Sequence, residues 1–67
     1  MKLKQAYTAA RKAAKRRNEI MYVWLDDYDK SYKIEEYAIG SDFDAETWYA
    51  GQNPVAAFDI DGSFISD

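Results

Sequence analysis

Two residue types are missing from this 67-residue chain, cysteine and histidine. Without cysteine there is no disulfide framework and no thiolate metal site. Without histidine the commonest general base and a usual zinc ligand are missing too. The three glycines, Gly40, Gly51 and Gly62, are isolated and do not form a phosphate-cradling loop. These absences exclude most familiar catalytic mechanisms, so we expect no enzyme, no cofactor and no metal site.

Long apolar runs are missing as well. No stretch approaches the about 18 to 20 apolar residues that span a membrane, and no apolar signal core follows the basic N-terminus. So short a chain can hardly enclose a cleft for a small-molecule substrate. We expect a cytoplasmic protein with no membrane association and no small-molecule substrate.

Two acidic segments invite a metal interpretation. Asp59 to Gly62 resembles part of an EF-hand loop, but with Gly62 at its sixth position the first ligand would be Ala57 and the last would lie beyond Asp67. A hairpin turn explains Asp61-Gly62 better. Asp26, Asp27 and Asp29 could gather a hard cation, but a solvated turn is the favoured interpretation.

Aromatic side chains are plentiful in the chain, with two Trp, six Tyr and three Phe. Each ring buries roughly 150 to 250 Å², so these residues can build one core and leave rings for an interface. The length leaves no room for a second folding unit. We expect residues 1–67 to form a single domain.

The clearest predicted element is a helix over residues 3–17, which are rich in Ala, Lys and Arg and free of Gly and Pro. One stripe of this helix is apolar and the other side is cationic. The stripe comprises Leu3, Ala6, Tyr7, Ala10, Ala13 and Ala14. Because most of these are Ala, the helix can approach a sheet closely, with Leu3 and Tyr7 as its large contacts.

The remaining pattern predicts strands. Residues 20–25 are apolar on both faces, as expected of a central strand, and a polar turn over residues 26–31 leads to a second strand over 32–37. Residues 55–60 and 63–66 predict another hairpin, with Asp61 and Gly62 as the central pair of a type I′ turn.

The segment from Ser41 to Gly51 is ambiguous. Asp42 or Asp44 can cap a short helix that runs through Tyr49 and ends at a left-handed Gly51. Thr47 to Ala50 can instead extend a strand, and the helix is preferred. The predicted fold class is α+β, with an N-terminal amphipathic helix packed on a small antiparallel sheet and a short second helix.

Charge is divided unevenly along the chain, whose net charge is −3. Residues 1–18 hold seven Lys or Arg and no acid, whereas residues 19–67 hold twelve acids against two Lys. Such asymmetry is typical of a protein that binds nucleic acid or binds another protein that does. The alternative is that the two halves simply neutralise each other across the fold.

One interpretation assigns the function to the acidic part. Proteins that grip DNA line their grooves with Lys and Arg, and carboxylates on a small domain can occupy such a groove. Tyr28, Tyr37, Trp48 and Tyr49 lie among the acids as candidate anchors. The predicted partner-binding residues are Asp26, Asp27, Asp29, Glu35, Glu36, Asp42, Asp44, Glu46, Asp59, Asp61, Tyr28 and Trp48. Solvated surface carboxylates are the equally weighted alternative.

A second interpretation assigns the function to the basic helix, which would bind RNA or DNA phosphates directly. Its candidate residues are Lys4, Arg11, Lys12, Lys15, Arg16 and Arg17. The charge of the other residues argues against a large contact with a polyanion. A solvated helix face, with cations that stabilise the helix dipole near its C-terminal end, is the favoured explanation of these residues.

The whole chain resembles the small acidic proteins of bacteriophages and mobile elements, in particular anti-CRISPR proteins of the DNA-mimic kind. The resemblance rests on the Lys2–Arg17 helix, the segments YVWLDDYD, YKIEEY and DFDAETWYAG, and the terminal PVAAFDIDG segment. It implies a bacterial cytoplasm, a CRISPR effector complex as partner, and inhibition by blocking that complex's DNA-binding channel. The basic helix departs from the most acidic mimics, so the resemblance leaves mimicry and steric blocking both open.

Overall fold

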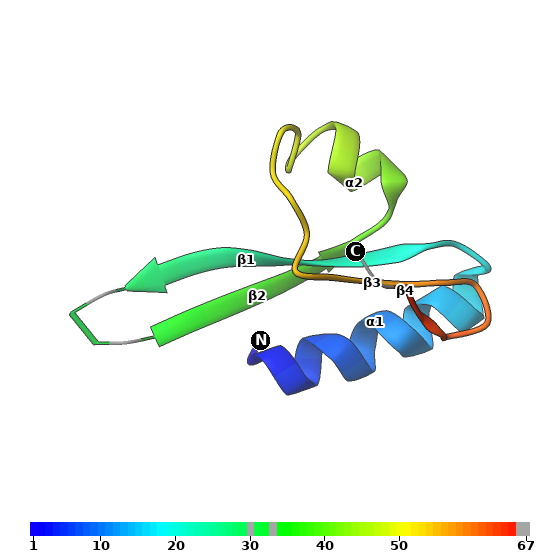
Figure 1. The fold of residues 1–67 in the computed structure, drawn as a ribbon, viewed down its shortest axis with the longest axis horizontal. Coiled ribbons are helices and arrows are strands. Elements are labelled where there is room, and N and C mark those ends of the chain that lie inside the picture. The colour runs from blue at the N-terminus through cyan, green and yellow to red at the C-terminus, as the bar shows by residue number, and fades with distance from the viewer. Residues whose placement is uncertain (30, 33, 66–67) are drawn as a thin grey trace.

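A helix and a four-stranded antiparallel sheet form the body of the protein (Figure 1). The computed structural model describes residues 1–29, 31–32 and 34–65. The elements are α1 (Leu3–Arg17), β1 (Met21–Asp29), β2 (Ile34–Gly40), α2 (Asp42–Glu46), β3 (Ala56–Phe58) and β4 (Phe64–Ile65). The strand order is β2-β1-β3-β4, so β1 lies inside the sheet as predicted. The expected α+β class is confirmed.

Helix α1 covers one face of the sheet through its alanine stripe. Ala6, Ala10, Ala13 and Ala14 are buried against Met21, Val23 and Phe58. Asn18 ends the helix in the left-handed conformation, and the Ala14 carbonyl accepts the N–H groups of Asn18 and Glu19. Small side chains let the helix backbone approach the strands, which is the close contact that the sequence predicts.

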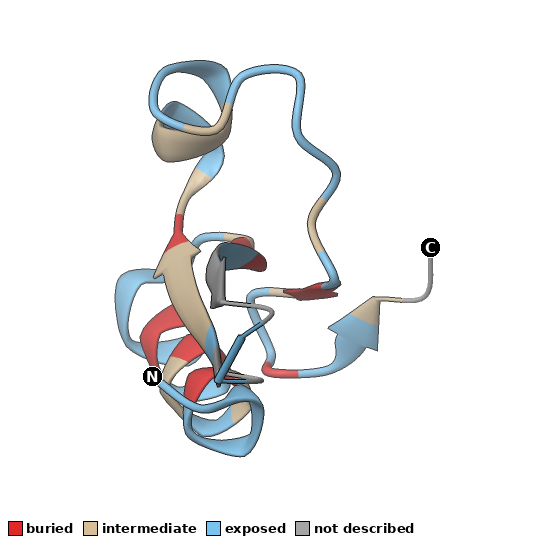
Figure 2. Ribbon diagram, turned by 90° about the vertical axis from the view of Figure 1, so that its left-hand side faces the viewer, coloured by how far each residue is buried: buried red, intermediate tan, exposed pale blue. Residues whose placement is uncertain are grey.

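Of the two large side chains on the apolar stripe of α1, only Tyr7 packs against the sheet. The Tyr7 ring packs edge-on against Phe58, with the ring centroids 5.6 Å apart. Leu3, which was expected to be the second large contact, is 39% exposed because it lies at the first turn of α1. Figure 2 shows the buried residues concentrated between α1 and the strands.

The first hairpin is longer than the sequence predicts. Residues 26–29, expected in a polar turn, continue β1 and pair with β2, with a bulge between Leu25 and Asp27. The backbone hydrogen bonds of the ladder outweigh the turn preference of the Asp residues. β2 correspondingly ends at Gly40, beyond the predicted Tyr37. Lys30 and Lys33 lie outside the described residues.

The second hairpin has a different turn from the one predicted. Gly62 N–H donates to the Asp59 carbonyl, and Asp59 N–H donates to the Ser63 carbonyl. A type I′ turn needs positive φ at both central residues, but of Asp61 and Gly62 only Gly62 has positive φ, at 87°. The loop is therefore a three-residue turn with glycine in the left-handed position. Its flanking strands are also shorter than predicted, and the predicted strand residue Ser66 lies outside the described residues.

The opposite face of the sheet carries residues 41–55, here called the lobe (Figure 1). The predicted short helix is confirmed in the lobe, although it ends at Glu46 and not at Tyr49. The predicted cap, Asp42 or Asp44, is wrong, because both lie inside the helix and Ser41 is the capping residue. Asp44 accepts hydrogen bonds from the Ser41 N–H and hydroxyl at 3.0 and 3.3 Å. Gly51 has the expected positive φ, but it serves the turn closed by Gln52 N–H and the Tyr49 carbonyl.

The lobe is much less buried than α1. None of the residues in α2 is buried, and Figure 2 shows this part of the chain as exposed or intermediate. Among the described residues, no helix is both long enough and apolar enough to cross a membrane.

Candidate protein-binding surface

Three aromatic rings form a ladder on the lobe side of the sheet. Trp24 of β1 lies parallel to Tyr49 of the lobe, with ring centroids 4.3 Å apart and planes 5° apart. Tyr22, two residues before Trp24 and so on the same strand face, lies 5.5 Å from it. Trp24 is fully buried under this contact, and Ala38 lies opposite it on β2. The ladder is the main attachment of the lobe to the sheet.

A carboxylate accepts the hydroxyl at each end of the ladder. Tyr22 donates to Asp42 Oδ1 at 2.7 Å, and Tyr49 donates to Asp26 Oδ1 at 3.0 Å. The bond to Asp42, with burial, raises the pKa of the Tyr22 hydroxyl. Burial, with the bond to Asp26, raises the pKa of Tyr49. Both acids thus fix the position of the lobe and remain exposed for other contacts.

The Trp24 indole N–H is an exception to this pattern of satisfied polar groups. It is buried and has no hydrogen-bond partner among the described residues. A buried donor without an acceptor costs about 1 to 3 kcal/mol. An acceptor placed near this N–H would therefore stabilise the arrangement.

Two large apolar side chains of the lobe are more than two-thirds exposed. Phe43 is 69% exposed and Trp48 is 77% exposed, and acids flank Phe43 on both sides in the sequence. Exposed aromatic residues within a charged rim are typical anchors of protein interfaces. Trp48 was predicted as a candidate; Phe43 was not. The Asp-Phe-Asp sequence in a helix too short to bury all its faces was the signal for Phe43.

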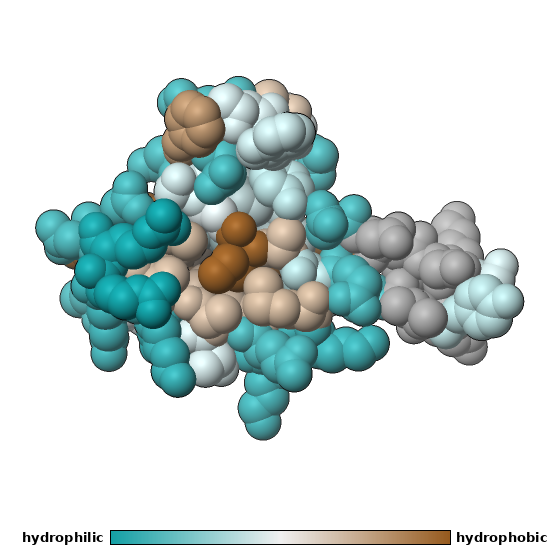
Figure 3. All heavy atoms as spheres, turned by 180° about the vertical axis from the view of Figure 1, so that it is seen from behind, coloured by the Kyte–Doolittle hydropathy of each residue, from teal (hydrophilic) through white to brown (hydrophobic). Residues whose placement is uncertain are grey.

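Apart from the lobe, the face seen in Figure 3 exposes little apolar area. There, hydrophobic side chains form a small patch in the middle of the molecule, and hydrophilic side chains surround it. Such a limited patch favours a polar or charged contact over a large apolar interface on this face.

The predicted acids fall into three groups and not on one continuous face. The first group lies on the part of the β1–β2 hairpin beyond β3, residues 26–29 and 34–36, here called the acidic arm. It carries Asp26, Asp27, Asp29, Glu35 and Glu36. The strand register places Asp27 opposite Glu36 and Tyr28 opposite Glu35. The arm projects along the longest dimension of the molecule, 38 Å (Figure 1).

The second group lies on the lobe and consists of Asp42, Asp44 and Glu46, all in α2. The Tyr49–Asp26 bond connects the lobe to the base of the acidic arm. Asp44 is close enough to Tyr49 to contribute to its raised pKa. The first two groups are therefore linked at Asp26, at the base of the arm, through the Tyr49 end of the ladder.

The third group, Asp59 and Asp61, is separate because it faces α1. A Cβ atom at the adjacent Gly62 would lie 2.5 Å from Lys15 Cε, so the Lys15 side chain crosses this turn. Hydrogen bonds from Ser63, with the charge of Lys15, lower the pKa of Asp61. Lysine at this turn offsets the acidic charge locally, which sets this group apart from the other two.

Several acids of the first two groups already accept hydrogen bonds within the protein. Glu35 accepts the Tyr37 hydroxyl at 2.6 Å, and Glu36 pairs with the Met1 amino group at 2.8 Å. The Met1 amino group lowers the pKa of Glu36. No hydrogen bond or ion pair within the described residues involves Glu46. The side chains of Asp27, Tyr28 and Asp29 lie outside the described part of the structure.

Some cationic side chains of α1 likewise contact a partner within the protein, and others do not. The Arg11 guanidinium lies 5.3 Å from the Phe58 ring centroid, and Arg17 Nε lies 3.6 Å from Glu19. Among the described residues, no ion pair is formed by Lys4, Lys12 or Arg16. Charge on the outer side of α1 is thus not neutralised by the acidic groups.

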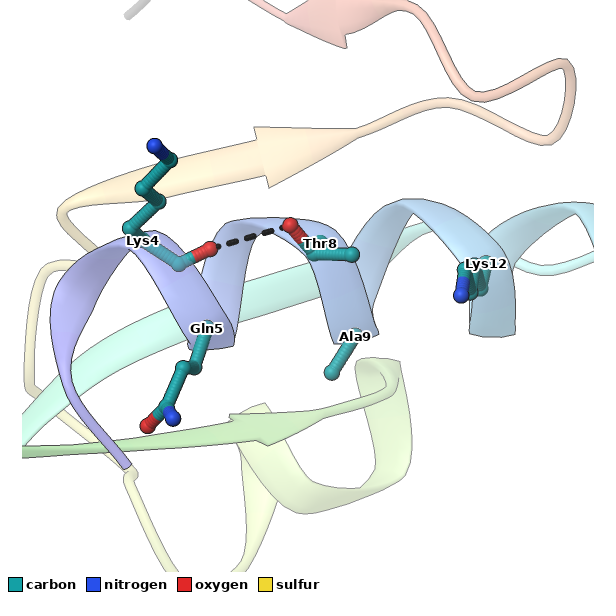
Figure 4. A pocket seen from close by; sticks show the side chains of 5 residues that line it. All are labelled: Lys4, Gln5, Thr8, Ala9 and Lys12. Carbon is teal, nitrogen blue, oxygen red and sulfur yellow. Dashed lines mark hydrogen bonds between the residues drawn. The ribbon is translucent and has the colours of Figure 1, made fainter.

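A shallow hollow of about 510 Å³ lies on this outer side of α1 (Figure 4). It is lined by Lys4, Gln5, Thr8, Ala9 and Lys12, all from the one helix. Figure 4 shows Lys4 and Gln5 directed to opposite sides, and the one hydrogen bond drawn joins the Thr8 hydroxyl to the Lys4 carbonyl at 3.1 Å. No second element encloses the hollow, so it is an open surface.

Comparison with protein families, curated proteins and solved structures finds no significant match to this chain. Within the described residues, no group of three or more acidic side chains is arranged to hold a metal ion. Function therefore has to be argued from this chain's own surface.

Proposed function

We propose that this protein binds a nucleic-acid-handling protein complex of a bacterial cell and blocks its nucleic-acid site. The contact surface is the acidic arm with the adjoining lobe, and a CRISPR effector is the partner that the resemblance implies. The observation that carries the proposal is the strand register. It gathers five acids on a two-stranded arm that extends beyond β3.

The charge density of the arm suits this role. Four residues of a strand span roughly 13 Å, a length over which one DNA strand carries about four phosphates. Five carboxylates against Lys30 and Lys33 give residues 26–36 a net charge of −3, which is close to that of a single strand of the same length. Carboxylates at this density complement a groove lined by Lys and Arg.

The lobe adds the apolar part of the contact. Phe43 and Trp48 are exposed beside the acids of α2. Rings of this kind bury apolar area on binding and contribute more to affinity than exposed ion pairs do. The protein would act as an inhibitor by occupying the groove, without catalysis.

The test is affinity capture from a nuclease-treated bacterial lysate with two tagged forms of the protein. One is the parent, and the other carries Asp27→Asn, Asp29→Asn and Glu46→Gln, which leave Asp26, Asp42 and Asp44 in place to hold the lobe. We expect the parent to retain a protein that duplex DNA displaces and that the variant does not retain. Equal retention by both forms, or retention that DNA does not affect, would contradict the proposal.

Direct nucleic-acid binding by α1 is the second candidate, favoured by the outer cations that have no acidic partner. Lys4→Glu, Lys12→Glu and Arg16→Glu would abolish such binding and leave the contacts of Arg11 and Lys15 intact. Fluorescence anisotropy with a labelled RNA and a labelled DNA duplex, at two salt concentrations, measures the effect. Absence of binding by the parent protein at low salt would exclude this candidate.

A further inference from the structure

The Tyr49 ring occupies an unusual position for a residue outside regular secondary structure. It lies after α2, in the turn that Gly51 completes, yet it stacks in parallel on Trp24 at 4.3 Å. Its hydroxyl reaches across to Asp26 on the base of the acidic arm. A flat group thus lies on an indole face while its polar end donates to a carboxylate.

An arginine side chain has the chemistry to make the same two contacts. Its guanidinium is planar and stacks on aromatic faces, and its N–H groups donate to a carboxylate, often through two bonds. A tyrosine hydroxyl supplies one donor and no charge. A guanidinium between Trp24 and Asp26 would add a second donor and a charge opposite to that of the carboxylate.

The charges around the ladder favour a cation at this position. Asp26 lies at the Tyr49 end and Asp42 at the Tyr22 end, and Asp44 is near Tyr49. No Lys or Arg among the described residues has an ion pair or ring contact with the ladder. Lysine would gain the charge attraction but lacks a flat surface for stacking.

Few apolar contacts hold the turn that carries Tyr49. No residue of α2 is buried, and backbone hydrogen bonds from Tyr49 N–H to the Asp44 carbonyl and from Val55 N–H to the Val23 carbonyl supplement the ladder. Gly51, next but one to Tyr49, has positive φ and open space where a Cβ atom would lie. Displacement of the Tyr49 ring would let the buried Trp24 indole N–H, which has no partner among the described residues, reach an acceptor.

We propose that Tyr49 fills, in the isolated protein, a stacking site on Trp24 that an arginine of the partner protein takes over on binding. The arginine lies on the Trp24 indole and donates to Asp26, and the Tyr49 ring moves out with the turn that carries it. This inference rests on the proposed function, because it names the side chain that the acidic surface selects. The indole N–H then donates to a backbone carbonyl of the arginine segment or to water.

The experiment compares two short synthetic peptides, one of alternating arginine and glycine and one of alternating lysine and glycine. The protein carries Trp48→Phe, which keeps an aromatic ring there and leaves Trp24 as the one tryptophan. Binding is measured by anisotropy of a labelled peptide and by the fluorescence of Trp24. We expect the arginine peptide to bind at least about threefold more tightly and to change the Trp24 emission.

Tyr49→Phe in the same background separates the stacking site from general charge attraction. This substitution keeps the ring but removes the hydroxyl that bonds Asp26. The arginine peptide should therefore bind Tyr49→Phe at least about threefold more tightly than it binds the Trp48→Phe protein. Tyr37→Phe is the matched control, because it removes another hydroxyl bonded to a carboxylate, away from the ladder. Because Glu35 belongs to the acidic arm, any effect of Tyr37→Phe should be the same for the arginine and the lysine peptide.

Three outcomes would overturn the inference. Equal, salt-sensitive binding of both peptides would leave the acidic surface as a cation-binding surface but remove the stacking site. An unchanged affinity of Tyr49→Phe would likewise show that Tyr49 does not compete with arginine. Failure of both peptides to bind would overturn the inference alone, because the affinity capture with the charge-neutralised variant tests the proposed function separately.

Discussion

Hydroxyl-to-carboxylate bonds recur at three tyrosines of this small protein. Tyr22 donates to Asp42, Tyr37 to Glu35 and Tyr49 to Asp26. These bonds use one oxygen of each carboxylate and favour the neutral form of the phenol. The acids that define the proposed surface therefore also contribute to its internal order.

The first prediction concerns alkaline pH. The pKa values of Tyr22, Tyr37 and Tyr49 are raised by their carboxylate partners and by burial. A pKa raised in the folded state means that the stabilisation is complete below the unfolded value of about 10 and is lost as pH rises through the folded values. Tyrosinate absorbance, titrated in buffer and in denaturant, should show later ionisation in the folded protein. Coincident titration curves would contradict this expectation.

The second prediction compares two glycines with positive φ. Gly62→Ala should destabilise the protein by about 2 kcal/mol, because the backbone is strained and the new Cβ would crowd Arg11 Cγ at 3.2 Å, whose guanidinium lies over Phe58. Gly51→Ala, where no atom lies within 4 Å, should cost only the backbone strain of about 1 kcal/mol. Urea unfolding of both variants measures the difference, and an equal loss would refute the close packing of Arg11 on this turn.

At the scale of elements, α1 is held to the sheet by small side chains. Ala10 and Ala14 are completely buried, and the large groups of the interface come from the strands. The separation between helix and sheet is therefore set by the alanine methyl groups. This arrangement explains why a helix of low hydrophobicity can still cover a core.

The third prediction tests that separation. Ala10→Leu should destabilise the protein by about 1 to 3 kcal/mol, because the larger side chain pushes the helix from the strands. Lys12→Leu, on the exposed side of α1, is the control and should change stability by less than about 0.5 kcal/mol. Urea unfolding of both variants provides the measurement. A tolerated Ala10→Leu would mean that the interface is loosely packed.

The fourth prediction concerns the attachment of the lobe. A Cβ at Gly40, where β2 ends, would lie 2.7 Å from Asp44 Cβ in α2. Gly40→Ala should therefore displace α2 and weaken the Trp24–Tyr49 stack, while α1 and the strands persist. Near-ultraviolet circular dichroism should fall and far-ultraviolet circular dichroism should be retained. Gly51→Ala, in the same lobe with open space, is the control; an unchanged near-ultraviolet spectrum in Gly40→Ala would contradict the role of this close contact.

At the scale of the whole molecule, the cations of α1 and the acids of α2 lie on opposite sides of the sheet, whereas Asp61 lies near Lys15 of α1. The cationic α1 covers one face, and the lobe with its acids covers the other (Figure 1). The few contacts between the two signs, such as Arg17 with Glu19, are exposed. Charge neutralisation across the fold therefore explains only part of the asymmetry.

The fifth prediction follows from this separation. Exposed ion pairs contribute at most about 1 kcal/mol each and are screened by salt, so the free energy of unfolding should change little between low and high ionic strength. Binding through the acidic arm should weaken strongly over the same range. Urea unfolding and partner binding at matched salt concentrations test both parts. A large loss of stability in salt would mean that contacts between the two charge signs hold the fold.

The local elements were largely predictable from sequence, because each depends on neighbouring residues. The α1 stripe, the central strand and the short helix after Ser41 follow from periodicity and capping residues. The turn at Asp61-Gly62 was predicted wrongly. An Asp-Gly pair suits both a two-residue type I′ turn and a three-residue turn that ends in a left-handed glycine, and the protein has the second. Residues 26–29 were expected in a turn because Asp favours turns locally. Their place in β1 depends on pairing with β2, which local sequence does not reveal.

What the sequence alone determined about this protein is its α+β class, its alanine-rich helix stripe and its uneven charge, since these depend on residue type and spacing. Only the tertiary structure decided which acids adjoin. It linked Asp26, at the base of the arm, to the lobe through Tyr49, and it set Asp61 apart near Lys15 of α1. It also brought Tyr49 onto Trp24, 25 residues earlier in the chain. The physical reason is that strand register and helix packing join residues distant in sequence, and no local pattern encodes those distances.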